Sequence, residues 1–340
     1  DYYSKDVLRE FVNLLKKHYY RQNIAFIKIN PEIAIGTINK KEIISNQNNL
    51  IEKNLIEIGF RKLEDKNKLF GTKIPKYNSI LLLKETSLKT ISKHTRNKIN
   101  KTLKNELVFE KGSREDIEIL YNFIKNKKKK PLNHYYNYYN AFSKNDSIDI
   151  FLVKINFEKC LINLKEKYED EYTNNSLIVG EMMKNPADEV LNKKLLSDRL
   201  LTIYKNNIAK ITKYLSEKKE EYIAGAITIK YKNRVNILIS GFNPKYRDFN
   251  PNYFLHYKLI EYYKNDFDFM DLNGITGNFT KNNPYKGLNE FKLGFKPKSF
   301  EFIGEFDLII NEGLYKNMER HGFLAQEFNR KQKELIKEND

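Results

Sequence analysis

A long stretch without strand signals, set between two strand-like segments, constrains the fold of this chain more than any other feature. Ile148–Ile155 and Tyr222–Tyr231 are short apolar runs typical of buried strands. Residues 157–219 between them are rich in Lys, Glu, Leu and Asn, and Asn185-Pro186 is their clearest break. The sequence therefore predicts two helices that form an antiparallel hairpin arm inserted between two strands.

Apolar side chains on both halves of this arm recur every three or four positions, as in a short coiled-coil seam. In the first half these are Leu161, Leu164, Tyr168 and Tyr172, and in the second half Leu196, Leu200, Ile203, Asn207, Ile211 and Tyr214. We expect these two rows to face each other.

The rest of the chain mixes helical and strand patterns without strict alternation, which favours an α+β fold. Helical spacing is found near residues 7–15, 50–60, 114–125 and 252–263, and in a basic helix over 88–103. Strand-like runs are found near 24–29, 79–83, 235–239, 267–272 and 300–309, and a Gly- and Asn-rich loop leads to Gly287.

Composition limits the class of protein. The formal net charge of +17 favours a polyanionic partner without identifying it, although the abundance of Lys, Asn and Ile is also what AT-rich coding produces. The single cysteine, Cys160, fits a reducing compartment. No apolar run has the roughly 18–20 residues that span a bilayer, and no signal peptide opens the chain. We therefore expect a cytoplasmic protein.

Several short stretches, in order along the chain, resemble the FemABX family, the peptidyltransferases of peptidoglycan interpeptide bridges. The most specific is Gly287–Phe295 (GLNEFKLGF), followed by Gly304-Glu305-Phe306. The others are Phe26–Pro31, Ser92–Ile99, Ala224-Gly225-Ala226, Tyr246-Arg247, Pro251-Asn252-Tyr253 and Phe269–Ile275.

The resemblance implies two GNAT-like (acyl-CoA N-acyltransferase-like) domains. The first would span residues 1–147, the second 148–299 with the arm at 157–219, and residues 300–340 would return to the first. Because Asp1 is followed at once by a helix with an apolar face, we expect an N-terminal part of the first domain to be missing.

The resemblance also places two candidate catalytic residues. Lys292 would lie at the substrate cleft, where a cation stabilises a carbonyl oxygen as negative charge develops; otherwise it is a solvent-facing lysine on a strand or turn. Glu305, on the predicted last strand, would accept a proton or orient the attacking amine; otherwise it is an exposed strand residue. Asp271 and Gly274 are expected to shape their loop rather than to do chemistry.

Five further residues are candidates for substrate binding by the same resemblance. The planar fork of Arg247 suits a phosphate, but a plain surface charge is the alternative. Tyr253 is either a cleft residue or a packing residue at a helix start. Asn252, Phe291 and Gly294 complete the set.

The implied reaction moves an amino acid from charged tRNA to the stem-peptide amino group of lipid II or a UDP-MurNAc-peptide. An aminoacyl ester is already activated, so no cofactor or metal is expected, and the five scattered histidines lack metal-ligand spacing. The basic helix and the arm are candidate tRNA contacts, and the enzyme would act at the inner face of the membrane. Whether the arm binds tRNA or stabilises a dimer stays open.

Two other functions remain as alternatives. An acyl-CoA-dependent GNAT N-acyltransferase usually carries an Arg/Gln-x-x-Gly-x-Gly/Ala loop for the pyrophosphate, and no arginine here is followed by that pattern. A non-catalytic, basic nucleic-acid-binding protein would explain the charge but leaves the Phe291–Phe295 motif without a purpose.

Overall fold

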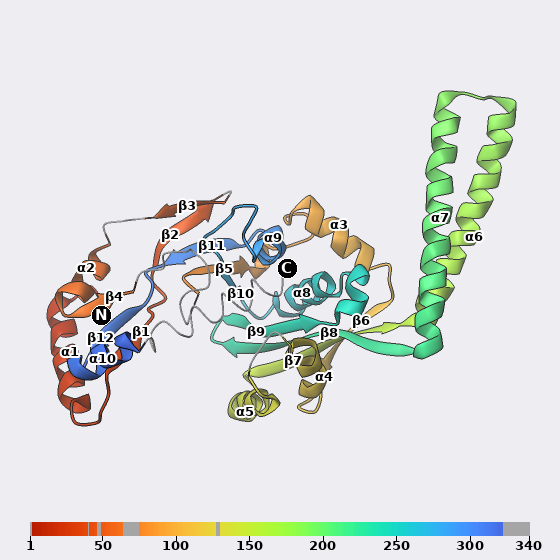
Figure 1. Ribbon diagram of the computed structural model, residues 1–340. Helices are drawn as coiled ribbons and strands as arrows, with labels where there is room; N and C mark the ends of the chain where they lie inside the picture. Colours follow the sequence, from red (N-terminus) through yellow and green to blue (C-terminus); the bar gives the residue numbers. More distant parts are fainter. Residues whose placement is uncertain (1, 40, 46–48, 64–74, 127–129, 322–340) are drawn as a thin grey trace. The chain divides into compact units, whose positions relative to one another are not determined.

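The computed structural model describes residues 2–39, 41–45, 49–63, 75–126 and 130–321. The chain divides into two compact units (Figure 1): unit 1 holds residues 1–92, 233–236 and 265–340, and unit 2 holds residues 93–232 and 237–264. Each combines helices with sheet, as the α+β prediction requires. The boundaries differ from the expected domains: unit 2 begins at residue 93 rather than 148, and the chain returns to unit 1 at 265 rather than 300.

Unit 1 contains two groups of strands. Its elements are α1 (Lys5–Tyr19), β1 (Phe26–Ile29), β2 (Ala34–Asn39), β3 (Glu42–Ser45), α2 (Leu50–Glu57), β4 (Phe60–Lys62), β5 (Tyr77–Leu82), η1 (Leu83–Glu85), β10 (Phe269–Ile275), α9 (Lys286–Gly294), β11 (Lys298–Phe302), β12 (Phe306–Ile309) and α10 (Glu312–Arg320). One group has the order β1-β12-β4 and the other β3-β2-β11-β5-β10, and all these neighbours are antiparallel.

The β1-β12-β4 sheet of unit 1 packs under α1 and α2. The amphipathic face of α1 buries Leu8 and Val12, and α2 buries Leu55, against Phe306 and Leu308 of β12. The single strand predicted over residues 300–309 is wrong, because it is two strands in two different sheets. The chain breaks at Gly304, whose φ of +94° is accessible to glycine but strained for other residues.

Unit 2 is built on four neighbouring strands. Its elements are α3 (Lys93–Thr102), β6 (Leu107–Gly112), α4 (Ile117–Ile124), α5 (Leu132–Phe142), η2 (Ser143–Asn145), β7 (Ile148–Asn156), α6 (Phe157–Lys184), α7 (Asp188–Glu217), β8 (Glu220–Tyr231), β9 (Arg234–Phe242), η3 (Pro244–Phe249) and α8 (Pro251–Tyr263). The strand order is β9-β8-β7-β6. Residues 234–236 of β9 belong to unit 1, where they pair in parallel with β10.

Helices cover both faces of the unit 2 sheet (Figure 1). Because side chains alternate along a strand, Ile148 and Ile150 of β7 pack with Leu120 of α4 and Tyr135 of α5. The next positions, Asp149 and Phe151, point to α8 on the opposite face, where the Phe151 ring meets Tyr263 edge-on at 5.8 Å. The short helix α5 has no counterpart among the sequence predictions.

A buried carboxylate joins the strands of unit 2 to α8. Asp149 is 2% exposed and accepts a hydrogen bond from the Tyr263 hydroxyl at 2.7 Å. The ammonium groups of Lys111 on β6 and Lys230 on β8 lie 2.6 and 3.0 Å from it. Burial alone would raise the pKa of Asp149, but the hydrogen bonds from Lys111, Tyr263 and Lys230 outweigh it and lower the pKa. Burial of the Tyr263 hydroxyl raises the pKa of that group.

The predicted hairpin between β7 and β8 is present as α6 and α7, joined at residues 185–187. Its seam matches the expected rows only in part. On α7, the expected residues Ile211 and Tyr214 are buried together with Val190 and Ser197. Leu196, Leu200 and Ile203 are exposed, as is Tyr172 of the row expected on α6. Two rows with heptad-like spacing lie on α7, and burial against α6 selected the row that carries Ser197.

A polar layer crosses the middle of the α6–α7 seam. The Asn175 amide donates to the Ser197 hydroxyl at 2.9 Å, and that hydroxyl donates to Glu171 at 2.5 Å. Lys194 pairs with Asp198, which also accepts from Asn175. Polar partners inside an otherwise apolar seam favour one register, because a shifted register leaves them unpaired.

Gly225 lies where β8 packs closely on β7. A Cβ atom at this position would come within 2.9 Å of Leu152 Cδ2 and 3.0 Å of the Phe151 carbonyl oxygen. We expect Gly225→Ala to lower the free energy of unfolding by about 1–3 kcal/mol, because the strand must shift to admit the methyl group. Urea denaturation measures this.

The control for that variant is Gly180→Ala in α6, where a Cβ atom meets nothing within 4 Å. Alanine should stabilise this helix interior by about 0.5–1 kcal/mol. Equal unfolding midpoints for Gly225→Ala and the wild type would contradict the close packing of β7 and β8.

Across the described parts of the chain, none of the helices combines the length and apolar character of a bilayer-crossing segment.

Candidate functional site

A distortion of β10 in unit 1 presents the Gly274 carbonyl. The pairing of β10 with β5 shifts register between Asp271 and Gly274, and Asn273 adopts a φ of +62°. The buried Asp271 carboxylate accepts from the Asn273 backbone N–H at 2.7 Å and from the Asn78 amide at 3.0 Å, and it also pairs with Arg234. Asp271 therefore holds the distortion in place, which agrees with its expected role in shaping the loop.

The loop after β10 is held by a buried network of amides. Asn289 of α9 accepts from the Thr276 backbone N–H at 3.0 Å and donates to the Thr276 hydroxyl at 2.8 Å. Asn283 donates to the same hydroxyl at 2.8 Å and to the Asn278 carbonyl at 2.7 Å. Thr276, Asn283 and Asn289 are all nearly inaccessible to solvent. The network ties α9 to the end of β10.

None of these network residues was a candidate in the sequence analysis. The only signal was the richness of the loop in asparagine, whose side chain hydrogen-bonds nearby backbone and so favours turns. Asn289 lies ten residues or more from its partners Thr276 and Asn278. Their convergence depends on the fold rather than on local sequence.

Lys292 lies on α9 and is buried, so the alternative of a solvent-facing lysine on a strand or turn is wrong. It is 9% exposed, and its ammonium group donates to the Gly274 carbonyl oxygen at 2.6 Å. The Lys292 ammonium is thus held at a defined position beside the distorted end of β10, which the hydrogen bonds of Asp271 stabilise.

Phe291 and Gly294 share α9 with Lys292. The Phe291 ring is half-buried and meets the Phe295 ring edge-on at 5.5 Å. The Gly294 carbonyl accepts from the Ser92 backbone N–H at 2.9 Å. These contacts fix the end of α9. A substrate-binding role for Phe291 or Gly294 stays a prediction.

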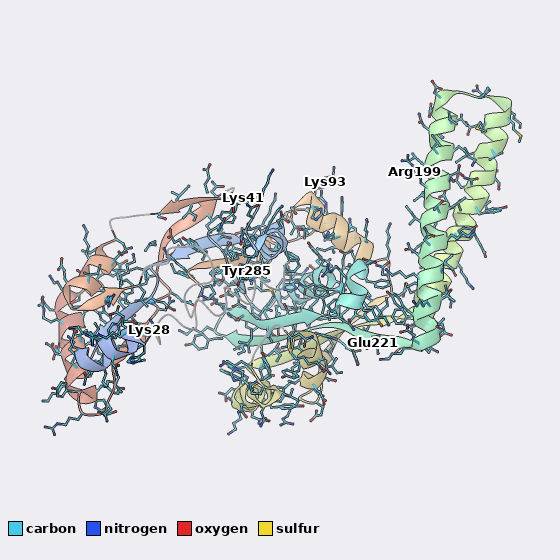
Figure 2. The ribbon with its side chains drawn as sticks, viewed as in Figure 1. Lys28, Lys41, Lys93, Arg199, Glu221 and Tyr285 are labelled. Atoms are coloured by element: carbon cyan, nitrogen blue, oxygen red, sulfur yellow. The ribbon has the colours of Figure 1, made fainter. Side chains whose placement is uncertain are left out.

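Glu305 lies between β11 and β12, beside the other sheet of unit 1. It is 4% exposed, and its carboxylate is 3.8 Å from the ammonium of Lys28. Figure 2 labels Lys28, which lies on β1. Lys28 is closer to Asp307, at 2.6 Å, and Asp307 also accepts from the Tyr315 hydroxyl at 3.0 Å. Glu305 is therefore a buried carboxylate next to an ion pair, not an exposed strand residue, and its catalytic role stays a prediction.

The remaining candidates, Arg247, Asn252 and Tyr253, belong to unit 2. Arg247 lies on η3 and is exposed. In the first turn of α8, the Asn252 side-chain oxygen is buried and has no hydrogen-bond partner among the described residues. A buried acceptor without a partner is costly, and a substrate-binding role for Asn252 stays a prediction.

Tyr253 lies next to the basic helix α3. The ammonium of Lys98 is 4.8 Å from the centre of the Tyr253 ring, within the range of a cation–π contact. α3 carries Lys93, Arg96, Lys98 and Lys101 and no acidic residue. This part of unit 2 therefore combines a concentrated positive charge with an aromatic ring, a combination suited to a phosphate-bearing ligand.

Within residues 2–39, 41–45, 49–63, 75–126 and 130–321, no group of three or more His, Cys, Asp and Glu side chains is placed to hold a metal ion.

The fold is that of a known class. It matches the crystal structure of FemX with a TM-score of 0.68 and 20% sequence identity, over 94% of this chain and 80% of that chain. Residues 1–320 match the model of the FemAB family, and the chain belongs to this family. The resemblance seen in the sequence is thus confirmed.

Named relatives agree with that assignment. A lipid II:glycine glycyltransferase of Staphylococcus epidermidis is 25% identical, over 94% of this chain and 77% of its own length. The enzyme of the same name from Staphylococcus aureus is 22% identical over the same shares.

Proposed function

We propose that this protein transfers an amino acid from charged tRNA to the stem-peptide amino group of lipid II and so builds the peptidoglycan interpeptide bridge. The observation that carries the proposal is the match of 94% of the chain to enzymes named lipid II:glycine glycyltransferase, together with the family match over residues 1–320. A UDP-MurNAc-peptide is the alternative acceptor.

The chemistry needs positioning and charge stabilisation more than a cofactor. The acceptor amine attacks the ester carbonyl carbon, a C–N bond forms, and the bond to the tRNA ribose oxygen breaks. The amine loses a proton and the ribose hydroxyl gains one. An ammonium group held beside the carbonyl oxygen stabilises the negative charge that develops there. Lys292, fixed on the Gly274 carbonyl, is the residue that we assign to this role, with no metal or cofactor required.

A proton acceptor is needed because the acceptor amine is mostly protonated at neutral pH, with a reference pKa of about 10.4 for a lysine-type amine. We assign this role to Glu305, whose carboxylate is buried beside Lys28. Phe291 and Gly294 on α9 would line the same site.

Unit 2 supplies the proposed contacts to phosphate. Arg247 is exposed and has the planar fork that suits a phosphate group. Tyr253 lies beneath Lys98. The Asn252 oxygen, an acceptor without a described partner, would bind an N–H or O–H group of the substrate rather than a phosphate. The helix α3, which has basic residues and no acidic ones, is the proposed contact for the tRNA backbone, since binding to phosphates depends on concentrated Lys and Arg.

The family also implies two GNAT-like domains, a coiled-coil arm and a cytoplasmic location at the inner face of the membrane. All three are part of the proposal. The heptad spacing of the inner α6–α7 seam supports the coiled coil, and an acceptor carried by a membrane lipid supports the location.

The test is transfer of radiolabelled amino acids from a total charged-tRNA pool to lipid II. We expect incorporation into lipid II that is abolished by prior RNase treatment, and separate charged tRNAs then identify the amino acid. Free amino acids without tRNA serve as the control. No incorporation from any charged tRNA, with turnover of acyl-CoA in a parallel assay, would replace this proposal by the acyl-CoA alternative.

A further inference from the structure

The arm carries a second apolar row that α6 does not cover. Leu196, Leu200 and Ile203 of α7 are 60%, 40% and 51% exposed. Their spacing of four and three residues puts them on one face of the helix. It is the same heptad-type spacing that forms a coiled-coil seam when a partner is present.

Leu177 of α6 lies beside this row. It is 71% exposed, and with Leu196 and Leu200 it lines an open groove between the two helices. Charged side chains border the groove: Glu171 and Glu181 come from α6, and Lys193 comes from α7. An apolar strip rimmed by charges is typical of a surface that binds another protein.

The charge of the arm does not suit a nucleic acid. α6 has six acidic and four basic side chains, and α7 has four acidic and six basic ones. The two helices therefore have no net charge together, in a chain whose net charge is +17. Binding to a phosphate backbone depends on concentrated Lys and Arg. The arm thus lacks the feature that makes α3 a candidate for RNA.

The charges of the arm are complementary between two copies of it. α6 is acidic on balance and α7 is basic on balance. A two-fold axis parallel to the arm would set α6 of one copy against α7 of the other at the same height. Leu177 and Leu196 lie at similar distances from the turn at 185–187, and so do Glu181 and Lys193. This symmetry therefore pairs leucine with leucine and glutamate with lysine.

From this apolar groove and the distribution of charge we infer that the grooved face of the arm binds the same face of a second copy of this chain. Leu177, Leu196 and Leu200 line the groove, and Ile203 continues the exposed row on α7. The interface is isologous, and it leaves the basic surface of α3 available for another ligand. Because the patch is small, the expected dissociation constant is about 1–100 µM.

The first test measures the mass of the full chain by sedimentation velocity from about 1 to 200 µM, a range that brackets the expected affinity. The wild type should shift from monomer to dimer. Leu196→Glu combined with Leu200→Glu should raise the dissociation constant at least about tenfold, because it buries four carboxylates in the dimer. These side chains are exposed within one copy, so circular dichroism should show unchanged helix content.

The matched control is Tyr172→Glu combined with Leu191→Glu. Both residues are exposed apolar positions of the arm that do not line the groove, and the change in net charge is the same. The control should dimerise like the wild type, within about twofold.

A cross-link tests the symmetry directly. A mixture of Leu177→Cys and Leu196→Cys copies should form disulfide-linked dimers faster than either variant alone, because the proposed symmetry sets position 177 of one copy against position 196 of the other. Cys160, common to all, is buried.

Three results would overturn the inference. The first is a wild type that stays monomeric to about 200 µM. The second is a groove variant that dimerises as well as its control. The third is a groove variant that loses tRNA binding retained by the Tyr172/Leu191 control, which would assign the face to RNA. Each of these is independent of the transfer assay.

Discussion

Lys292→Ala should lower kcat for amino-acid transfer to lipid II by about 10²–10³-fold, the usual effect of removing one group that stabilises an oxyanion. Its ammonium is held at 2.6 Å from the Gly274 carbonyl oxygen on a helix anchored by the Asn289 network. The position of the charge is thus set before substrate binds. KM should change much less than kcat, because this interaction strengthens in the transition state. Initial rates at varied lipid II concentration measure both.

The control is Lys286→Ala at the start of the same helix. The Lys286 side chain is 52% exposed and lies 3.9 Å from Glu290, an ordinary surface pair. Its loss should leave kcat within about twofold. Since Lys292 is buried, thermal unfolding of both variants must show that the rates refer to folded protein. A folded Lys292→Ala variant with wild-type kcat would remove Lys292 from the proposed mechanism.

The largest effect on stability is expected at Asp149. Asp149→Asn keeps the shape of the side chain but removes a buried charge that faces Lys111 and Lys230. Breaking a buried ion pair costs about 3–5 kcal/mol. We expect about 3 kcal/mol, because the Lys111 side chain is 48% exposed and regains water. Urea denaturation at pH 7 measures the loss.

Asp146→Asn is the matched control, since Asp146 also lies 3.0 Å from Lys230 but its side chain is 84% exposed. It should change the free energy of unfolding by less than about 0.5 kcal/mol. Equal effects of the two substitutions would contradict the assignment of Asp149 as the buried centre of the cluster.

The pH dependence of stability gives Asp149 a second signature. Its pKa is lowered in the folded protein, so its contribution is fully present above the unfolded-state pKa of about 3.9. That contribution is lost as the pH falls through the folded-state pKa. The difference in unfolding free energy between wild type and Asp149→Asn should therefore shrink in acid. A difference that stays constant down to about pH 2 would contradict the lowered pKa.

The sequence predicted the elements whose signals are local. The strand β7 follows from a continuous apolar run, and the helices α2, α8, α6 and α7 follow from helical spacing of apolar side chains, all near the predicted bounds. It also predicted the family, because the stretch at Gly287–Phe295 and its companions occur in a fixed order. These features depend on neighbours within a few turns of the chain.

Predictions failed where a local pattern allowed two structures. The solvent-facing alternative for Lys292 placed it on a strand or turn, yet it lies on the helix α9, where Asn289 and Lys292 both contact the end of β10. Residues 300–309 look like one strand, yet Gly304 divides them between two sheets. In both cases long-range contacts outweighed local propensity.

By itself, the sequence therefore determined the helical arm, the α+β character and the family. Only the tertiary structure decided which row of α7 is buried, since Ser197 and Leu196 both belong to rows with helical spacing and only contact with α6 separates them. It also decided the surroundings of Asp149, which gathers Lys111, Lys230 and Tyr263 from three other elements. The physical reason is that periodicity reports which side chains lie on one face, whereas partners distant in the chain determine which face is covered.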